Sequence, residues 1–171
     1  MLTEVTTRVA DRLAIADLLH AYCESLDSMD LDRLRAVFAP DCEVAFGPDV
    51  RLNANGVEAL VAALARLWRW RRTSHHLSNV RITFDDPDSA DVVSYVIAWH
   101  ERPDLSTATL YGVYRDRVVR TPDGWRIAAR RQEMNGADAG FSVGIFPAAR
   151  RPPPDGWVAP EIDVPPARSD A

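Results

Sequence analysis

The chain has 171 residues, of which 47% are hydrophobic, enough for one folded domain with a sizeable core. Its 25 acidic and 20 basic residues give a formal charge of −5 and are interspersed, which argues against the one-signed basic surface of nucleic-acid-binding proteins. No apolar stretch approaches the roughly 20 residues that span a bilayer, and the first eight residues lack a signal-peptide pattern. We therefore expect a cytoplasmic protein with neither a nucleic-acid nor a membrane partner.

The first part of the chain predicts helices separated by a short strand. Residues from about Thr6 to Leu26 have apolar side chains at helical spacing, namely Ile15, Leu18, Leu19, Tyr22 and Leu26. A second helix is expected from Asp30, as its cap, to Phe38. An alternating strand follows at Cys42–Phe46, and a third helix is expected from about Val57 to Trp70.

The second part of the chain is rich in β-forming residues. Strands are expected near Ser74–Phe84, Asp91–Arg102, Thr107–Arg120 and Gly124–Met134. The turn at Thr121–Gly124 is a strong hairpin signal. Helices followed by consecutive strands predict an α+β domain with a curved antiparallel sheet. We expect this domain to occupy residues 1–148, and a proline-rich arm or tail to occupy residues 149–171.

One acid and one histidine, supplied by different elements, are the main candidates for chemistry. Asp27 lies near the end of the first helix, and His75 belongs to the run His75–Asn79 that opens a predicted strand. A carboxylate that bonds an imidazole fixes its tautomer and stabilises its charged form, so the pair could transfer protons near neutral pH. The alternative role for Asp27 is structural, at the end of one helix just before Asp30 caps the next.

The order of elements and several short motifs resemble the SnoaL-like branch of the nuclear-transport-factor-2-like superfamily. The motifs are Tyr22, Asp27 and Asp30 within residues 15–38, Gly56-Val57-Glu58-Ala59, His75-His76-Leu77-Ser78-Asn79, and Asp123-Gly124-Trp125-Arg126-Ile127. The resemblance covers about residues 6–148. It implies a cone-shaped roll in which a curved sheet wraps around the N-terminal helices. Scytalone dehydratase, bile-acid dehydratase and lindane dehydrochlorinase are similar members of this branch.

The resemblance also implies roles for individual residues. Asp27 matches the acid and His75 the base of a His–Asp dyad in a cofactor-free lyase. Arg130 matches a basic pocket residue, and Tyr22 takes the place of another polar pocket residue. His100 could supply the histidine that scytalone dehydratase has on the next strand, although a partly exposed role beside Glu101 is the alternative.

Two geometric arguments complicate this assignment. Strict alternation along Ser74–Phe84 places His76 with the apolar residues Val80 and Ile82, and His75 on the other face, unless a bulge near Ser78 changes the phase. In addition, five residues of ideal helix leave Tyr22 and Asp27 about 140° apart. Both would then line one pocket only if the helix ended or bent before Asp27.

Other residues could contact a substrate but not a metal. His76, Asn79, Trp99 and Tyr111 join Tyr22 and His100 as candidate binding residues, in an apolar pocket suited to a flat or polycyclic molecule. The four histidines lack metal-site spacing, and neither a metal nor another cofactor is expected. Cys23 and Cys42 are interpreted as buried side chains without chemistry.

The sequence therefore predicts a cofactor-independent lyase or dehydratase acting on a hydrophobic, polycyclic small molecule. His75 would be the base, Asp27 its orienting acid, and Arg130 with Tyr22 would polarise the substrate. A polyketide cyclase or ketosteroid-type isomerase is one alternative; a non-catalytic ligand-binding or oxygenase small-subunit-like module is another. The apolar segment Phe141–Phe146 further favours a homo-oligomer, either a trimer or a dimer.

Overall fold

The computed structural model describes residues 2–138, 146–148 and 155–156. In these ranges the α-helices are α1 (Leu2–Ser28), α2 (Leu31–Val37) and α3 (Val57–Leu64), with 3₁₀ turns η1 (Val50–Leu52) and η2 (Ala65–Arg69). The strands are β1 (Phe38–Ala45), β2 (Asn53–Asn55), β3 (Arg72–Phe84), β4 (Ser89–Glu101), β5 (Thr107–Thr121) and β6 (Gly124–Ala137). This α+β arrangement confirms the predicted fold class. Within the same residues, no helix has both the length and the apolarity needed to cross a membrane.

The helices begin and end close to the predicted positions, with one change of geometry. The Asp30 side chain accepts a hydrogen bond from the Arg33 backbone N–H at 2.9 Å, which confirms it as the cap of α2. The third helix does not continue to Trp70 as an α-helix, because after Leu64 it tightens into η2. The change matters because it sets the direction of the side chains on that segment.

The strands form one sheet in the order β2-β1-β6-β5-β4-β3. The long strands β3 to β6 pair antiparallel with their chain neighbours, and the predicted hairpin turn joins Thr121 to Gly124. The expectation of a purely antiparallel sheet is wrong at β1, which pairs with β6 in parallel, Val44 opposite Arg130. No hairpin joins β1 to β6, since α3 and the strands β2 to β5 lie between them in the chain.

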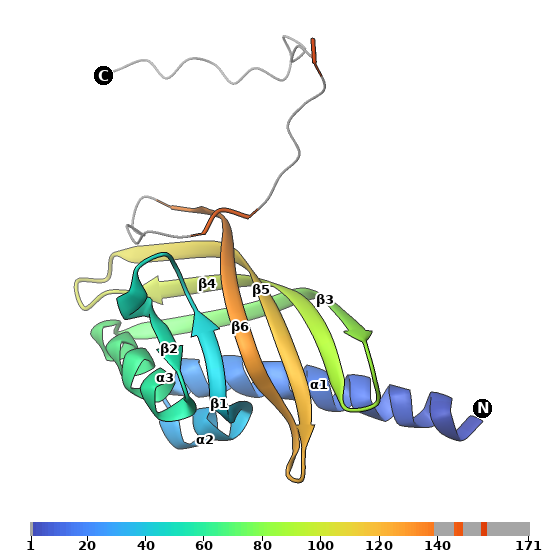
Figure 1. The fold of residues 1–171 in the computed structure, drawn as a ribbon. Helices are drawn as coiled ribbons and strands as arrows, with labels where there is room; N and C mark the ends of the chain where they lie inside the picture. The colour runs from blue at the N-terminus through green and yellow to red at the C-terminus, as the bar shows by residue number, and fades with distance from the viewer. Residues whose placement is uncertain (1, 139–145, 149–154, 157–171) are drawn as a thin grey trace.

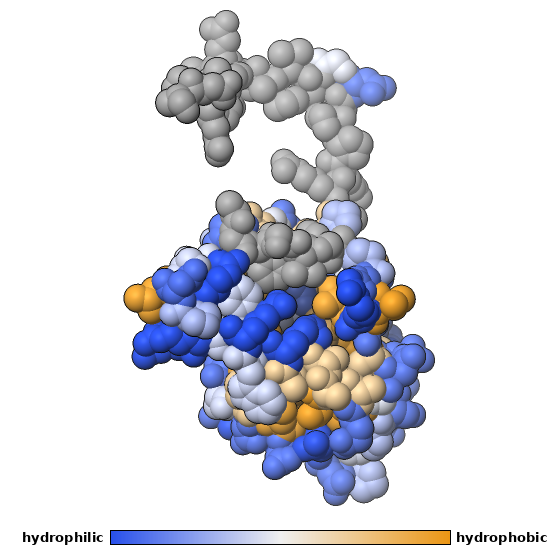
Figure 2. All heavy atoms as spheres, turned by 90° about the vertical axis from the view of Figure 1, so that its left-hand side faces the viewer, coloured by the Kyte–Doolittle hydropathy of each residue, from blue (hydrophilic) through white to orange (hydrophobic). Residues whose placement is uncertain are grey.

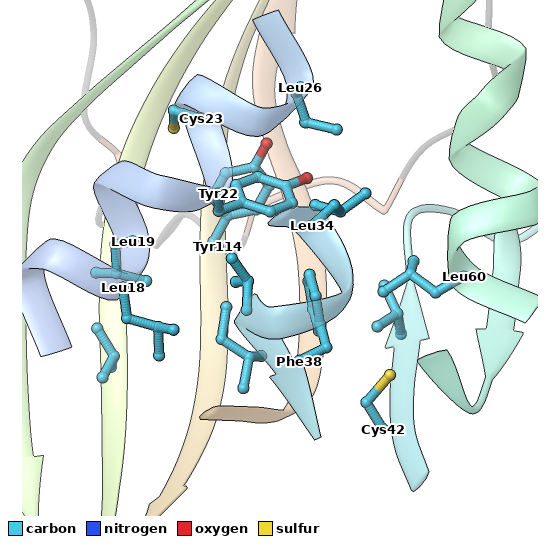
Figure 3. Packing of buried hydrophobic residues seen from close by; sticks show 14 of the residues in the cluster. Leu18, Leu19, Tyr22, Cys23, Leu26, Leu34, Phe38, Cys42, Leu60 and Tyr114 are labelled. Atoms are coloured by element: carbon cyan, nitrogen blue, oxygen red, sulfur yellow. The ribbon is translucent and has the colours of Figure 1, made fainter. Parts of the chain in front are cut away.

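The core lies between the inner face of this curved sheet and α1, which crosses the sheet (Figure 1). Figure 3 shows that α1 contributes Leu19, Tyr22 and Leu26 to the core, which confirms the predicted apolar stripe. Their side chains are at most 2% exposed. Tyr114 meets them from β5. Cys23 and Cys42 are free and buried, as expected.

The outer face of the sheet is more exposed. Tyr95, Ile97 and Tyr111 lie there, 42%, 45% and 47% exposed. At the end of the molecule that carries α3, strongly hydrophilic residues border hydrophobic surface (Figure 2). The predicted homo-oligomer stays a prediction. Residues 141–145 of the apolar segment, and all of the proposed 149–171 arm except 155–156, lie outside the described residues.

Among the sheet glycines that the structure describes, Gly112 leaves the least room for an added methyl group. A Cβ there would lie 2.8 Å from the Glu133 carbonyl oxygen and 3.0 Å from a Leu110 methyl group. We predict that Gly112→Ala lowers the free energy of unfolding by roughly 1–3 kcal/mol, because backbone on the next strand must move. Gly136→Ala is the matched control, since nothing lies within 4 Å of its added Cβ. Urea denaturation measures both, and equal losses would contradict the steric explanation.

Candidate functional site

Asp27 in the last turn of α1 is bonded to the beginning of β3. His75 Nδ1 lies 2.6 Å from Asp27 Oδ1, and the His75 backbone N–H donates to Oδ2 at 2.8 Å. The Thr73 hydroxyl donates to Oδ1 at 3.0 Å. Thr73 and His75 are two residues apart, so both side chains leave the same face of the strand. One carboxylate thus receives three hydrogen bonds from one strand.

These contacts determine the protonation state of the acid. Burial raises the pKa of Asp27, but the side-chain bond and positive charge of His75, its backbone N–H and Thr73 outweigh burial and leave the pKa below its usual value. Asp27 is therefore a carboxylate at neutral pH and can only accept hydrogen bonds. His75 must then carry its proton on Nδ1, which leaves Nε2 as the basic nitrogen of the neutral ring.

A β-bulge decides which histidine faces inward. The β3–β4 register shifts between Ser78 and Arg81, and Asn79 adopts a positive φ of 51°. The extra residue reverses the alternation, so His75 before the bulge and Ile82 after it share the inner face. Strict alternation along the sequence placed His76 on the apolar face because it did not include the extra residue of the bulge.

His75 borders a cavity of about 80 Å³ between η2, α1 and the inner face of the sheet. The lining residues are Tyr22, Leu26, Phe46, Leu52, Leu64, Arg66, Leu67, Arg69, Trp70, His75, Ala98, His100, Leu110, Tyr114 and Gln132. Asp27 is not among them. It lines a separate groove with His75, between α1 and β3. The imidazole therefore lies between the acid and the cavity.

The sequence analysis expected α1 to end or bend before Asp27 if Tyr22 and Asp27, about 140° apart on an ideal helix, were to line one pocket. The structure shows a different arrangement. The helix does not end or bend before Asp27, because it runs to Ser28. Tyr22 reaches the cavity directly, whereas Asp27 reaches it only through His75. The two residues diverge around the helix as ideal geometry requires.

His100 also lines the cavity, beside His75. The centroids of the two rings are 5.7 Å apart, and the Trp70 ring lies 4.8 Å from that of His100. Burial, followed by the charge of His75, lowers the pKa of His100 to about 4. His100 is therefore neutral at pH 7 and can donate or accept a hydrogen bond without carrying charge.

Arg130 lies behind the cavity wall, which corrects its predicted contact with substrate. Its Nε and Nη2 donate to the two oxygens of Asp116, both at 2.7 Å, and both side chains are 0% exposed. Its guanidinium carbon lies 4.0 Å from the Tyr22 ring centroid and 4.1 Å from that of Tyr114. The two tyrosines line the cavity and Arg130 does not.

The buried pair also affects the ionisation of these tyrosines. Burial would lower the pKa of Arg130, but the charge and hydrogen bonds of Asp116 raise it above its usual value. Burial raises the pKa of Tyr22 despite the nearby positive charge. Tyr22 is therefore a neutral phenol at pH 7 and can donate a hydrogen bond into the cavity.

Four other predicted binding residues lie elsewhere, and their assignment to this pocket is wrong. His76 is exposed on the outer face, where its Nε2 lies 2.9 Å from the Ser74 hydroxyl. Asn79 is exposed within the bulge. Trp99 and Tyr111 lie on outward-facing positions of β4 and β5 and do not line the cavity. The aromatic character of the last two residues indicated burial but not which face they occupy.

Several site residues were missed by the sequence prediction. Asp116 and Gln132 could have been found by alternation, since each lies two residues from an inward side chain, Tyr114 and Arg130 respectively. Thr73 likewise precedes His75 by two. Arg66, Arg69 and Trp70 carried no such signal, because their direction depends on the change to 3₁₀ geometry.

Comparison with known proteins agrees with this fold. Residues 7–131 match the family model described as SnoaL-like domain. An uncharacterized protein of Mycobacterium tuberculosis is 30% identical over 125 residues, 71% of this chain and 84% of its own length.

Solved structures extend the comparison. The structure of a candidate scytalone dehydratase from Novosphingobium aromaticivorans superposes with a TM-score of 0.81 and 29% identity, covering 86% of this chain and 99% of the other. A hexachlorocyclohexane dehydrochlorinase (LinA type 2) has a TM-score of 0.71 over 88% and 98% of the two chains. At 20% identity, that second likeness concerns the fold alone.

The hydrogen bonds to Asp27 predict a pH-dependent contribution to stability. Because its pKa is lowered in the folded state, the contribution is complete above the unfolded value of about 3.9 and is lost as pH falls through the folded pKa. We predict that Asp27→Asn destabilises the protein at pH 7 and that the difference from wild type shrinks towards pH 2. Denaturation across this range tests it, with exposed Asp17→Asn as the control. A pH-independent difference would contradict it.

The Arg130–Asp116 pair predicts a larger effect. Asp116→Asn leaves a buried guanidinium without its counter-charge and should cost about 3–5 kcal/mol of unfolding free energy. Replacing both partners, Asp116→Leu with Arg130→Met, should recover most of that loss. Arg131→Gln, which removes a partly exposed 3.7 Å ion pair with Glu133, should cost less than about 1 kcal/mol. Similar losses for Asp116→Asn and Arg131→Gln in denaturant titrations would contradict the prediction.

Proposed function

We propose that this chain, which belongs to the SnoaL-like domain family, is a cofactor-independent lyase that removes water from a small hydrophobic molecule. The observation that carries the proposal is the 2.6 Å contact between His75 Nδ1 and Asp27, made on the side of the ring away from the cavity. It leaves His75 Nε2 as a base beside the apolar space in which a substrate would bind.

In the proposed reaction, His75 Nε2 takes a proton from a carbon next to a carbonyl group. The electrons of that C–H bond form a C=C bond, and the hydroxyl group on the neighbouring carbon leaves with its bonding pair. The departing oxygen receives a proton from the His75 imidazolium and leaves as water, which returns the ring to its starting form. Asp27 stabilises the imidazolium that forms between these events, since it already accepts the Nδ1–H bond.

Neutral hydrogen-bond donors around the cavity would stabilise the charge that develops on the substrate. Tyr22 and His100 both line it, and each is uncharged at pH 7 with a proton to donate. Arg130 supports this step from a distance, because its guanidinium is held against the Tyr22 ring. Donors that are fixed before the reaction need no reorganisation during it.

The volume of the cavity favours a compact substrate. About 80 Å³ is well below the roughly 300–1,000 Å³ typical of sites for drug-sized ligands. This argues against the polycyclic substrate that the sequence suggested and favours a smaller molecule. The 29% identity to a candidate scytalone dehydratase supports loss of water more than loss of chloride, since the likeness to the dehydrochlorinase concerns only the fold.

The proposal predicts that His75→Gln removes catalysis without unfolding the protein. We expect wild type to dehydrate at least one compact β-hydroxy ketone from a panel that includes scytalone, followed by the ultraviolet absorbance of the conjugated product. His75→Gln should lower kcat about 10²- to 10⁴-fold, the usual contribution of a general base. Asp27→Asn should lower it as well, because the ring would lose its orienting carboxylate.

The neighbouring residue provides the matched control. His76→Gln changes the same residue type on the outer face and should leave kcat near wild type. Exchange of the substrate C–H for deuterium from solvent reports the proton-transfer step itself, and a cyclase or isomerase would share that step. Equal exchange by wild type and His75→Gln would overturn the proposal and favour a ligand-binding module.

A further inference from the structure

The cavity beside His75 carries positive charge that the proposed reaction does not use. Arg66 and Arg69 line it, and its lining residues include no aspartate or glutamate. His100 adds no charge at pH 7, because its pKa is about 4. The cavity is thus cationic in a protein whose formal net charge is −5.

The geometry of η2 places the two arginines side by side. Residues 65–69 form a 3₁₀ helix, in which positions i and i+3 lie directly above one another. Arg66 and Arg69 therefore project from the same side of η2. In a regular α-helix continued from α3, the same two side chains would diverge by about 60°.

Neither arginine is paired with an acid within the part of the chain that the structure describes. Arg66 Nη1 donates to the Ala63 carbonyl at 2.7 Å, and its guanidinium carbon lies 5.6 Å from the Phe46 ring centroid. The Arg69 guanidinium lies 5.2 Å from the centroid of Trp70. By contrast, ion pairs with acids are made by Arg33, Arg35, Arg51, Arg71, Arg115, Arg117, Arg120, Arg130 and Arg131.

Holding two such cations together is unfavourable without an anion. Burial lowers the pKa of Arg66, and the positive charge of Arg69 lowers it further, while Tyr22 acts in the opposite direction. A bound anion would relieve both effects, because it attracts each guanidinium and replaces part of its lost hydration. The apolar lining strengthens that attraction relative to water.

We propose that Arg66 and Arg69 form the binding site for a carboxylate group of the substrate. A guanidinium matches a carboxylate with two parallel N–H···O bonds, and a single planar carboxylate suits the small volume. This inference rests on the proposed function for the identity of the cavity as the substrate site. It narrows the substrate class to compact hydroxy acids that also carry a carbonyl group, with the carboxylate held at η2 and the reacting carbon beside His75.

Ligand binding tests the proposal without any turnover. Benzoate is the probe, benzamide its uncharged counterpart and phenyl phosphate the alternative anion, each titrated into the full-length protein and followed by NMR signals of the His100 ring. We expect benzoate to bind at least tenfold more tightly than benzamide. Arg66→Gln and Arg69→Gln should each weaken benzoate about tenfold or more, the loss typical of one charge-assisted hydrogen bond, and should leave benzamide unchanged.

The control matches the change in net charge made by the test variants. Arg72→Gln removes an equal charge from an exposed position at the start of β3 that does not line the cavity, and it should leave benzoate binding within twofold of wild type. Two single variants are used so that misfolding of one, detected by its thermal midpoint, leaves the other as a test. Equal affinity for benzoate and benzamide, or an equal loss in Arg72→Gln, would overturn the proposal.

The remaining outcomes separate this inference from the lyase proposal. Tighter binding of phenyl phosphate than of benzoate, lost in both arginine variants, would overturn the choice of carboxylate and assign the site to a phosphate group. Benzoate binding that depends on Arg66 and Arg69 but not on His75, tested with His75→Gln, would support the carboxylate site even if dehydration is never observed. Dehydration of a hydroxy ketone that carries a carboxylate by Arg66→Gln at the wild-type kcat/KM would overturn the carboxylate site and leave the lyase proposal standing.

Discussion

The carboxylate of Asp27 connects the end of the long helix to the sheet, and the geometry of the site depends on that connection. Three donors from two residues of β3 meet its two oxygens, so both the main chain and the imidazole of His75 are fixed relative to α1. A surface ion pair would not fix the ring in this way, because its partners keep their rotamer freedom. Here the hydrogen bond from the His75 backbone N–H holds the strand in place against α1, and the bond to Nδ1 prevents the imidazole ring from rotating about its side-chain torsions.

A second buried charge pair shapes the other side of the cavity. Arg130 and Asp116 face each other across β6 and β5, and their charges are fully removed from solvent. Replacing such a pair by hydrophobic residues is often neutral or stabilising, so stability alone does not explain why it is useful here. Its position does offer a reason: the guanidinium lies about 4 Å from the rings of Tyr22 and Tyr114, which form part of the cavity wall. The pair thereby orders two phenols that can donate hydrogen bonds to a ligand.

The sequence predicted the element types and the Asp27–His75 contact partners, but it could not predict which face most strand residues occupy. Helical spacing placed Leu19 and Leu26 in the core, because the helix period is local information. His75 faces inward because of the bulge at Asn79. That bulge is a property of the pairing between β3 and β4, so local sequence patterns do not reveal it. The parallel partner of β1 depends on contacts between segments that lie far apart in the chain. Arg130 was predicted to be a pocket residue because the family resemblance implied that role, and the resemblance did not show that two tyrosines would lie between it and the cavity.

The cavity is bordered by different groups at its two sides, with the His75 base at one side and the arginines of η2 at the other. The base at one side is an imidazole held by an anion that does not itself line the space, and His100 next to it is kept neutral by burial. The positive charge that does border the cavity comes from η2, where 3₁₀ geometry aligns two arginines. A substrate with a carboxylate would be attracted to that side only, because the other side presents neutral donors. A cavity of about 80 Å³ offers only a small contact area to a ligand. Attraction from one side would therefore be the main force that orients a small molecule there. The same anion would stay away from Asp27, whose charge lies on the far side of His75.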